Sequence, residues 1–382
     1  MPGKPWITAN QVTLARLIPM PLLSWLIYRG AESGAESGRG FLDNPYMWWA
    51  LIAGTLIGCT DWVDGMLARK YGPTVLGGLL DPIADKVFIA FAYIPFADDN
   101  INLFPAWVAA LMFTREFFIT ALRSAYEQRN LTLKTSYLAK VKTWTQMQGI
   151  GVILLFPLVG PDSVFLTWFL IVATIVPLLV MAGFWLIKKK FWKGALVMSG
   201  SVAPILALHL YGDVQLTVRW IMFAVVGLTW LSAFDYIAIG WKQLRGRGDF
   251  SRADGVRLLG ALGMPSLLFA VLVQQPPAPV WPIFAIMSLE LAVGGLDNLM
   301  SHHKRATKAL AWGSRVLGIC ALLGGALLVP DHAEWFLYGA TAVSLVGVAA
   351  EFWRGRDYFL DKRIRDRALR EAAVHQPESQ LT

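Results

Sequence analysis

The sequence predicts an all-α protein, a polytopic integral membrane bundle of about twelve transmembrane helices. Two observations support this prediction. Of the 382 residues, 56% are hydrophobic and only 16% are charged, a balance typical of chains that face lipid. In addition, apolar stretches of about 20 residues, the length that crosses a bilayer, recur along the whole chain.

The apolar stretches give the order and the limits of the expected helices. Short polar segments separate them, and Gly72–Pro73 ends the second helix because proline cannot continue it. The AESGAESG run at 31–38 falls in the first loop, where we expect a flexible linker. The expected spans lie near residues 10–28, 45–67, 78–97, 104–122, 143–160, 164–187, 194–211, 216–241, 256–273, 279–299, 309–329 and 333–353.

Lysine and arginine are distributed unevenly between the expected loops. Most of the 34 such residues precede the first span or follow an even-numbered one, whereas the odd-numbered loops hold only Arg29 and Arg39. Since cytoplasmic loops are enriched in these residues, we expect both termini to face the cytoplasm, in a bacterial inner (plasma) membrane. The net charge of +8 follows from this bias and from attraction to anionic lipid, so no nucleic acid partner is expected.

Four carboxylates interrupt the apolar pattern on what we predict to be the cytoplasmic side. Asp61 and Asp64 are three residues apart and Asp81 and Asp85 are four apart, so each pair shares one face of a helix. Acids so close in an apolar chain cannot all stay ionised without positive compensation, which a divalent cation supplies. Oxygen ligands without His or Cys favour Mg²⁺ or Mn²⁺ over zinc. The alternative is that neighbouring Arg and Lys side chains neutralise the acids.

The stretch that holds these acids resembles the signature of the CDP-alcohol phosphatidyltransferase family, D-x2-D-G-x2-A-R followed by G-x3-D-x3-D. Every fixed position is present, and the spacer is one residue shorter than is commonest in the family. The resemblance implies a core of six helices, two ions of Mg²⁺ or Mn²⁺, and a homodimer. It implies that the metal ligands are Asp61, Asp64, Asp81 and Asp85, and that Asp85 is also the catalytic base. It places around the CDP group the residues Asn10, Thr13, Arg16, Thr60, Gly65, Arg69, Thr74 and Gly77.

Further stretches resemble the members of this family that use sn-glycerol 3-phosphate, the phosphatidylglycerophosphate synthases. They are Thr114–Arg123, Lys140–Met147 and Leu228–Ser232. The dianion of glycerol 3-phosphate needs a basic pocket at the cytoplasmic surface. The residues expected to supply that pocket are Arg115, Arg123, Lys140 and Lys142. For the two lysines the alternative is ordinary loop charge on the cytoplasmic side.

The expected reaction is metal-dependent transfer of the phosphatidyl group from CDP-diacylglycerol to sn-glycerol 3-phosphate, which gives phosphatidylglycerophosphate and CMP for phospholipid biosynthesis. One alternative is the same chemistry with another acceptor alcohol, as in cardiolipin or phosphatidylinositol phosphate synthesis. A second alternative is a membrane transporter whose acids form a cation path. In that case Asp81→Asn would block ion flux, and CMP release would be absent in every variant.

The domain prediction divides the chain near residue 247. Residues 1–247 form the phosphatidyltransferase domain with an inserted helix pair at about 160–212; the alternative core consists of the first six spans. Residues 248–353 form a four-helix membrane domain of unknown role, and 354–382 form a charged cytoplasmic tail. In the four-helix domain Glu290 and Asp297 share a helix face. An internal ion pair that orders helix packing is favoured there over a lipid or ion contact that also involves Arg315.

Overall fold

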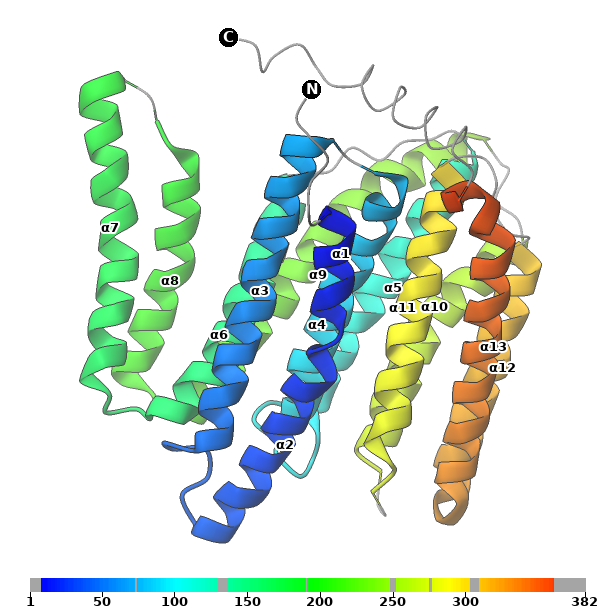
Figure 1. Cartoon of the computed structure of the whole chain (residues 1–382), viewed down its shortest axis with the longest axis horizontal. Helices are drawn as coiled ribbons and strands as arrows, with labels where there is room; N and C mark the ends of the chain where they lie inside the picture. Colours follow the sequence, from blue (N-terminus) through cyan, green and yellow to red (C-terminus); the bar gives the residue numbers. More distant parts are fainter. Residues whose placement is uncertain are drawn as a thin grey trace.

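The computed structural model describes residues 8–72, 74–129, 137–189, 191–247, 252–274, 277–302 and 309–360. Within these ranges every regular element is helical, with thirteen α-helices and no strand (Figure 1). The all-α prediction is therefore confirmed. Seven of the helices are long and apolar enough to cross a membrane, as expected of an integral membrane protein. The part of the predicted tail beyond residue 360 lies outside the described ranges.

The helices follow the apolar stretches closely. Each predicted span overlaps a helix, and most of the limits differ by only a few residues. The bounds are α1 (Ala9–Leu17), α2 (Met20–Ser37), α3 (Pro45–Tyr71), α4 (Val75–Ala97), α5 (Ala106–Gln128), α6 (Tyr137–Val159), α7 (Val164–Lys188), α8 (Lys193–Tyr211), α9 (Val214–Arg247), α10 (Arg252–Leu272), α11 (Val280–His302), α12 (Ala309–Leu328), the 3-10 turn η1 (Pro330–His332) and α13 (Ala333–Leu360).

The first predicted span is wrong in one respect, because two helices take its place. α1 ends at Leu17, and Pro19 is the N-cap of α2. Proline fits the start of a helix, where no N–H is needed, but it stops the helix before it. The prediction of a flexible linker at 31–38 is also wrong, since α2 continues to Ser37 and ends at Gly38, which has a φ of 68°. The alanines and glutamates of that run are good helix formers.

Local caps place the ends of α3 and α4 beside each other. α3 ends at Tyr71, and the following Gly72 has a φ of 92°, which glycine adopts without strain. α4 begins after Thr74, whose side-chain oxygen accepts a hydrogen bond from Gly77 N at 2.9 Å. α1 packs against both helices. The carboxylates of α3 and α4 are thereby brought to the same end of the bundle.

α4 and α5 lie at the centre of the bundle (Figure 1). α4 packs against α1, α2, α6 and α11, while α5 packs against α9, α10 and α11. Stacked ring pairs join the two halves of the chain, with centroids 4.9 Å apart for Phe91 and Phe284 and 5.8 Å apart for Phe113 and Phe269. By contrast, α7 packs mainly against α8, and this hairpin leans away from the rest of the bundle.

Ion pairs are buried among the C-terminal helices. The expected internal ion pair is confirmed for Glu290, which lies 2.8 Å from Arg315 Nη2. Asp297 also forms an internal ion pair, at 3.3 Å, but its partner is Arg257 rather than Arg315. The reason is that α10 as well as α12 presents an arginine to these helices, which the spacing along α11 alone does not reveal. Such pairs satisfy charges that would otherwise be costly in an apolar interior.

A glycine lets α11 approach α4 closely. A Cβ at Gly295 would lie 2.7 Å from Ile83 Cγ1, far inside normal carbon contact. We expect Gly295→Leu to lower the apparent Tm of the purified protein, because such overpacking costs about 1–3 kcal/mol. Gly318→Leu is the matched control, since a Cβ there would meet no atom within 4 Å. Equal Tm values for the two variants would contradict this close approach.

Candidate functional site

Arg16 of α1 links the aspartates of α3 and α4. Its Nη1 atom lies 2.8 Å from Asp61 Oδ1 and 3.9 Å from Asp64 Oδ2, while Nη2 lies 3.0 Å from Asp85 Oδ1. The side chains of Arg16 and Asp64 are each 3% exposed, whereas Asp61 is 51% and Asp85 33% exposed. The cluster is therefore buried at its base and open on the side of Asp61 and Asp85, where a ligand has access.

Thr13, one turn before Arg16, connects Asp64 of α3 with Asp81 of α4. Its Oγ1 atom lies 3.0 Å from Asp64 Oδ2 and 2.9 Å from Asp81 Oδ1, and it also lies 3.1 Å from Ala9 O. A hydroxyl has one proton to donate, so these oxygens share it. Thr13 thus holds Asp64 of α3 next to Asp81 of α4, and Arg16 in the same way holds Asp61 next to Asp85.

The donor chemistry of this cluster fits a divalent metal. Among the described residues, no three His, Cys, Asp or Glu side chains are arranged as ligands around one point, and the carboxylates are directed at Arg16 and Thr13. All four, however, offer oxygen atoms, which Mg²⁺ and Mn²⁺ prefer. Asp85 Oδ1 is buried and accepts no hydrogen bond from the described residues, despite its ion pair with Arg16. One arginine against four carboxylates leaves an excess of negative charge that favours a cation.

Two of the remaining expected CDP ligands contact each other near the start of α4. Thr74 Oγ1 donates a hydrogen bond to Asn10 Oδ1 at 2.7 Å. A Cβ at Gly77 would lie 3.0 Å from a side-chain oxygen of each, so a larger residue would crowd both. These three residues therefore form a second group of polar atoms beside Thr13 at the start of α1 and α4.

The other three expected CDP ligands lie on α3 alone. Thr60 Oγ1 donates to Ile57 O in its own helix at 2.6 Å. A Cβ at Gly65 would lie 3.4 Å from Arg69 Nη1, so these two are neighbours, and Arg69 is exposed. Within the described residues, no hydrogen bond joins Thr60 or Arg69 to α1 or α4. Both remain available to a ligand that enters from the open side of the cluster.

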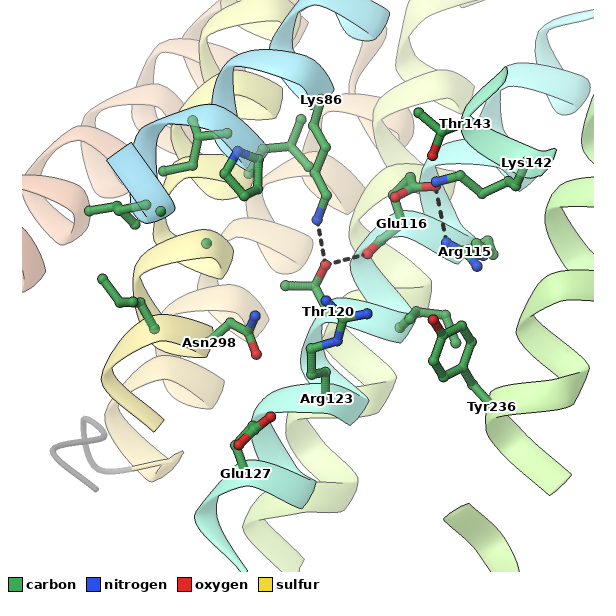
Figure 2. A pocket seen from close by; sticks show the side chains of 18 of the residues that line it. Lys86, Arg115, Glu116, Thr120, Arg123, Glu127, Lys142, Thr143, Tyr236 and Asn298 are labelled. Atoms are coloured by element: carbon green, nitrogen blue, oxygen red, sulfur yellow. Dashed lines mark hydrogen bonds and ion pairs between the residues drawn. The ribbon is translucent and has the colours of Figure 1, made fainter. Parts of the chain in front are cut away.

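A cavity of about 840 Å³ lies next to the aspartates, between α4, α5, α6, α9 and α11 (Figure 2). α4 contributes Pro82 and Lys86, each directly after a signature aspartate, so this helix borders both the cluster and the cavity. The polar side chains of the lining are Lys86, Arg115, Glu116, Thr120, Arg123, Glu127, Lys142, Thr143, Tyr236 and Asn298. Its cations outnumber its carboxylates, which favours an anionic ligand.

Glu116 joins two of the predicted basic residues in the cavity wall. Lys142 Nζ lies 2.6 Å and Arg115 Nη1 3.2 Å from Glu116 Oε1. Arg115 also donates to α9, from Nε to Thr229 O at 3.0 Å and from Nη2 to Ser232 Oγ at 2.7 Å. Each nitrogen of this guanidinium already has a protein partner, so Arg115 holds α5 to α9 as well as adding positive charge to the cavity.

The cavity contains two further cations with few protein partners. Lys86 Nζ donates to Thr120 Oγ1 at 2.6 Å. Successive helix residues point about 100° apart, so Lys86 turns away from the cluster and into the cavity. Arg123 lies over the Tyr236 ring at 5.9 Å, with no hydrogen bond or ion pair to any described residue. The side chain of Lys140 lies outside the described residues.

Comparison with known proteins links the chain to one family. The model of the CDP-alcohol phosphatidyltransferase family matches residues 6–180. A probable phosphatidylglycerophosphate synthase of Mycobacterium tuberculosis (strain H37Rv) is 39% identical over 155 residues, which are 40% of this chain and 68% of that protein. A CDP-diacylglycerol–glycerol-3-phosphate 3-phosphatidyltransferase of Bacillus subtilis is 32% identical over 148 residues, 38% of this chain and 75% of that protein.

A third relative gives the same picture. The CDP-diacylglycerol–glycerol-3-phosphate 3-phosphatidyltransferase of Escherichia coli (strain K12) is 33% identical over 134 residues, 33% of this chain and 74% of that protein. No solved structure matches the chain significantly. The family match covers the four aspartates and the cavity walls from α4, α5 and α6, but it ends within α7 and leaves out α9 and α11.

Proposed function

Because the chain belongs to the CDP-alcohol phosphatidyltransferase family, we propose that this membrane enzyme transfers the phosphatidyl group of CDP-diacylglycerol to sn-glycerol 3-phosphate, giving phosphatidylglycerophosphate and CMP. One observation carries the choice of acceptor. The aspartate cluster borders a cavity rich in cations, and α4 contributes to both. A phosphorylated alcohol in that cavity would have its hydroxyl near the cluster and its phosphate among the cations.

The chemistry assigned to the aspartates is an in-line displacement at the β-phosphorus of the donor. Asp61, Asp64, Asp81 and Asp85 would hold two ions of Mg²⁺ or Mn²⁺, which when bound neutralise the diphosphate and the leaving oxygen. The primary hydroxyl oxygen of the acceptor bonds to the β-phosphorus as the bond to CMP breaks, and its proton passes to Asp85. The exposure of Asp85 on the open side of the cluster supports its role as the base.

The residues around the cluster are assigned to the cytidine diphosphate. Asn10, Thr74 and Gly77 meet at the start of α4, and the glycine leaves room for a phosphate close to the backbone. On the exposed side of α3, the proposed ligands are Thr60, Gly65 and Arg69. Thr13 and Arg16 would orient the carboxylates as well as border the donor, because their described contacts are with the aspartates.

An apolar groove offers a place for an acyl chain of the donor. It has a volume of about 670 Å³ and lies between α1, α2, α4 and α11. Its lining includes Leu17, which directly follows Arg16, together with Phe91, Phe284 and Trp281. We assign this groove to the lipid tail because its lining is almost wholly apolar and includes Leu17, the neighbour of Arg16 in the chain.

For the acceptor phosphate we propose Arg123, Lys142 and Lys86, with Lys140 as a further candidate on the same helix as Lys142. Arg123 is the strongest of these because its guanidinium contacts the Tyr236 ring but forms no hydrogen bond or ion pair with a described residue. Arg115 is assigned to positioning α9 and to the net charge of the cavity, given its contacts with Thr229 and Ser232.

The arrangement of the helices supports a core of α1 to α6 together with α9. α9 packs against both α5 and α6, and Tyr236 of α9 lines the cavity, whereas α7 packs mainly on α8. We therefore propose that residues 160–212 are an inserted hairpin, although the family match runs into α7. The lysine and arginine bias supports a cytoplasmic active site in a bacterial inner membrane. A homodimer is proposed from the family resemblance alone.

The proposed acceptor is tested by supplying the purified protein with CDP-diacylglycerol and one labelled alcohol at a time. We expect CMP release and a labelled lipid product with sn-glycerol 3-phosphate, and loss of both when divalent metal is chelated. Phosphatidylglycerol and inositol phosphate serve as the rival acceptors. Turnover with either of these, together with indifference to sn-glycerol 3-phosphate, would overturn the assignment.

Thr13→Val tests the link between the two helices that hold the aspartates. The variant keeps the shape of the side chain but removes the hydroxyl that reaches Asp64 and Asp81. We expect CMP release to fall about tenfold or more, because a hydrogen bond to a charged group is worth about 1.5–3 kcal/mol. Thr13→Ser should retain most activity. Thr55→Val is the control, since Thr55 on α3 donates to Leu51 O of its own helix and to no other described residue. A fully active Thr13→Val enzyme would refute the role.

A further inference from the structure

One wall of the acceptor cavity comes from a helix outside the family match. α11 packs against α4 and α5 and contributes Leu291, Gly295, Asn298 and Leu299 to the lining. The family model ends at residue 180. The C-terminal helices therefore form part of the cavity, because α11 is one of its five walls.

Asn298 is the polar side chain of this wall. Figure 2 shows it projecting from α11 toward the side of α5 that carries Thr120 and Arg123, across the cavity from Lys142. Its Oδ1 atom is buried and has no hydrogen-bond partner among the described residues. A buried amide oxygen without a partner is unusual in folded proteins. Since no described neighbour fixes that oxygen, a half-turn of the amide brings either its oxygen or its NH₂ group to the cavity at no cost in protein hydrogen bonds.

Different groups in and beside the cavity suit different groups of the acceptor. The cations suit its phosphate, and the neighbouring aspartates suit the hydroxyl that reacts. Glycerol 3-phosphate has a second hydroxyl between these two, which is both a donor and an acceptor. An uncharged amide can bind such a group in either orientation, whereas Leu291 and Leu299 beside it cannot.

We propose that Asn298 is a specificity-determining residue, whose side-chain amide hydrogen-bonds the secondary hydroxyl of the acceptor. The inference rests on the proposed function, because it takes sn-glycerol 3-phosphate as the acceptor. It assigns a role to the C-terminal helices: they select a phosphorylated diol over a phosphorylated alcohol with a single hydroxyl.

The test compares two acceptors in the full-length enzyme: sn-glycerol 3-phosphate and 3-hydroxypropyl phosphate, which keeps the primary hydroxyl and the phosphate but lacks the secondary hydroxyl. The wild type should have a KM about tenfold lower for sn-glycerol 3-phosphate, the value of one hydrogen bond. In both Asn298→Leu and Asn298→Ala that advantage should vanish, because the KM for sn-glycerol 3-phosphate rises about tenfold while that for 3-hydroxypropyl phosphate stays unchanged. The use of two variants separates loss of the amide from a change in the volume of the side chain.

Two outcomes would overturn this inference while leaving the proposed function intact. In one, the variants raise the KM for both acceptors equally, which would show a structural role for Asn298. In the other, the wild type has no preference for sn-glycerol 3-phosphate, or the variants keep the wild-type preference. In both cases the ratio of the two KM values does not change on substitution, and Asn298 does not contact the secondary hydroxyl. If the wild-type enzyme fails to use sn-glycerol 3-phosphate at all, the proposed function itself is wrong, and the inference falls with it.

Discussion

Asp85→Asn is expected to reduce CMP release by about a thousandfold or more. Asparagine keeps the size of the side chain but cannot take the proton of the acceptor hydroxyl. A general base alone contributes about 10²–10⁴-fold to a rate. Asp85 is in addition one of the four proposed metal ligands, so its loss affects two parts of the chemistry. The measurement is single-turnover CMP release from purified enzyme with saturating acceptor.

The control for Asp85→Asn is Asp99→Asn, because Asp99 is an exposed carboxylate just beyond the far end of α4. It should be as active as the wild type. Both variants should elute as the wild type does in size-exclusion chromatography, since the remaining contacts of Arg16 with Asp61 keep α1 in place. Activity of Asp85→Asn within tenfold of the wild type would remove Asp85 from the mechanism.

Much of the fold could be predicted because a helix that crosses a bilayer must contain an apolar stretch of about 20 residues. Every predicted span overlaps a helix, since that signal depends only on composition within one segment. The break at Pro19 was missed because proline is compatible with the interior of an apolar stretch when a new helix starts there. The sequence does not predict the helix at 31–37, because the glycines and serines of this run are typical of linkers while its alanines and glutamates favour a helix. Only the structure shows that the helical preference is the stronger of the two.

The sequence predicted the aspartate cluster better than it predicted the cavity. Helical spacing fixes which face each pair of aspartates shares, and the turn at Gly72 brings the two helices together. The cavity depends on which helices become neighbours, and spacing within a helix does not contain that information. The places of Lys86 and Asn298 in the lining both follow from that packing, and neither has a signal in the spacing of its own helix. Asn298 lies more than 200 residues from the aspartates along the chain, and only the packing of α11 on α4 and α5 brings it into the cavity lining.

Arg123→Gln is expected to raise the KM for sn-glycerol 3-phosphate about 10- to 100-fold with a much smaller change in kcat. Arg123 contributes a guanidinium that no described protein carboxylate neutralises, and a charged hydrogen bond to a phosphate is worth about 1.5–3 kcal/mol. Its loss weakens binding of the acceptor in the ground state and in the transition state alike, so KM rises while kcat changes little. The KM for CDP-diacylglycerol should stay unchanged, because the proposed donor residues lie on α1, α3 and the start of α4.

Arg115→Gln distinguishes this binding role from a structural one, because Arg115 lines the same cavity but is fully engaged with protein groups. It should lower the apparent Tm, since it breaks the contacts that hold α5 to α9 and removes one partner of the buried Glu116, a loss of about 3–5 kcal/mol for such pairs. Arg123→Gln should leave the Tm unchanged, and Arg39→Gln, a change in an exposed loop, should alter neither property. The assignment of Arg123 to the acceptor phosphate would be wrong if its variant lost Tm rather than affinity, or if the KM values for donor and acceptor rose together.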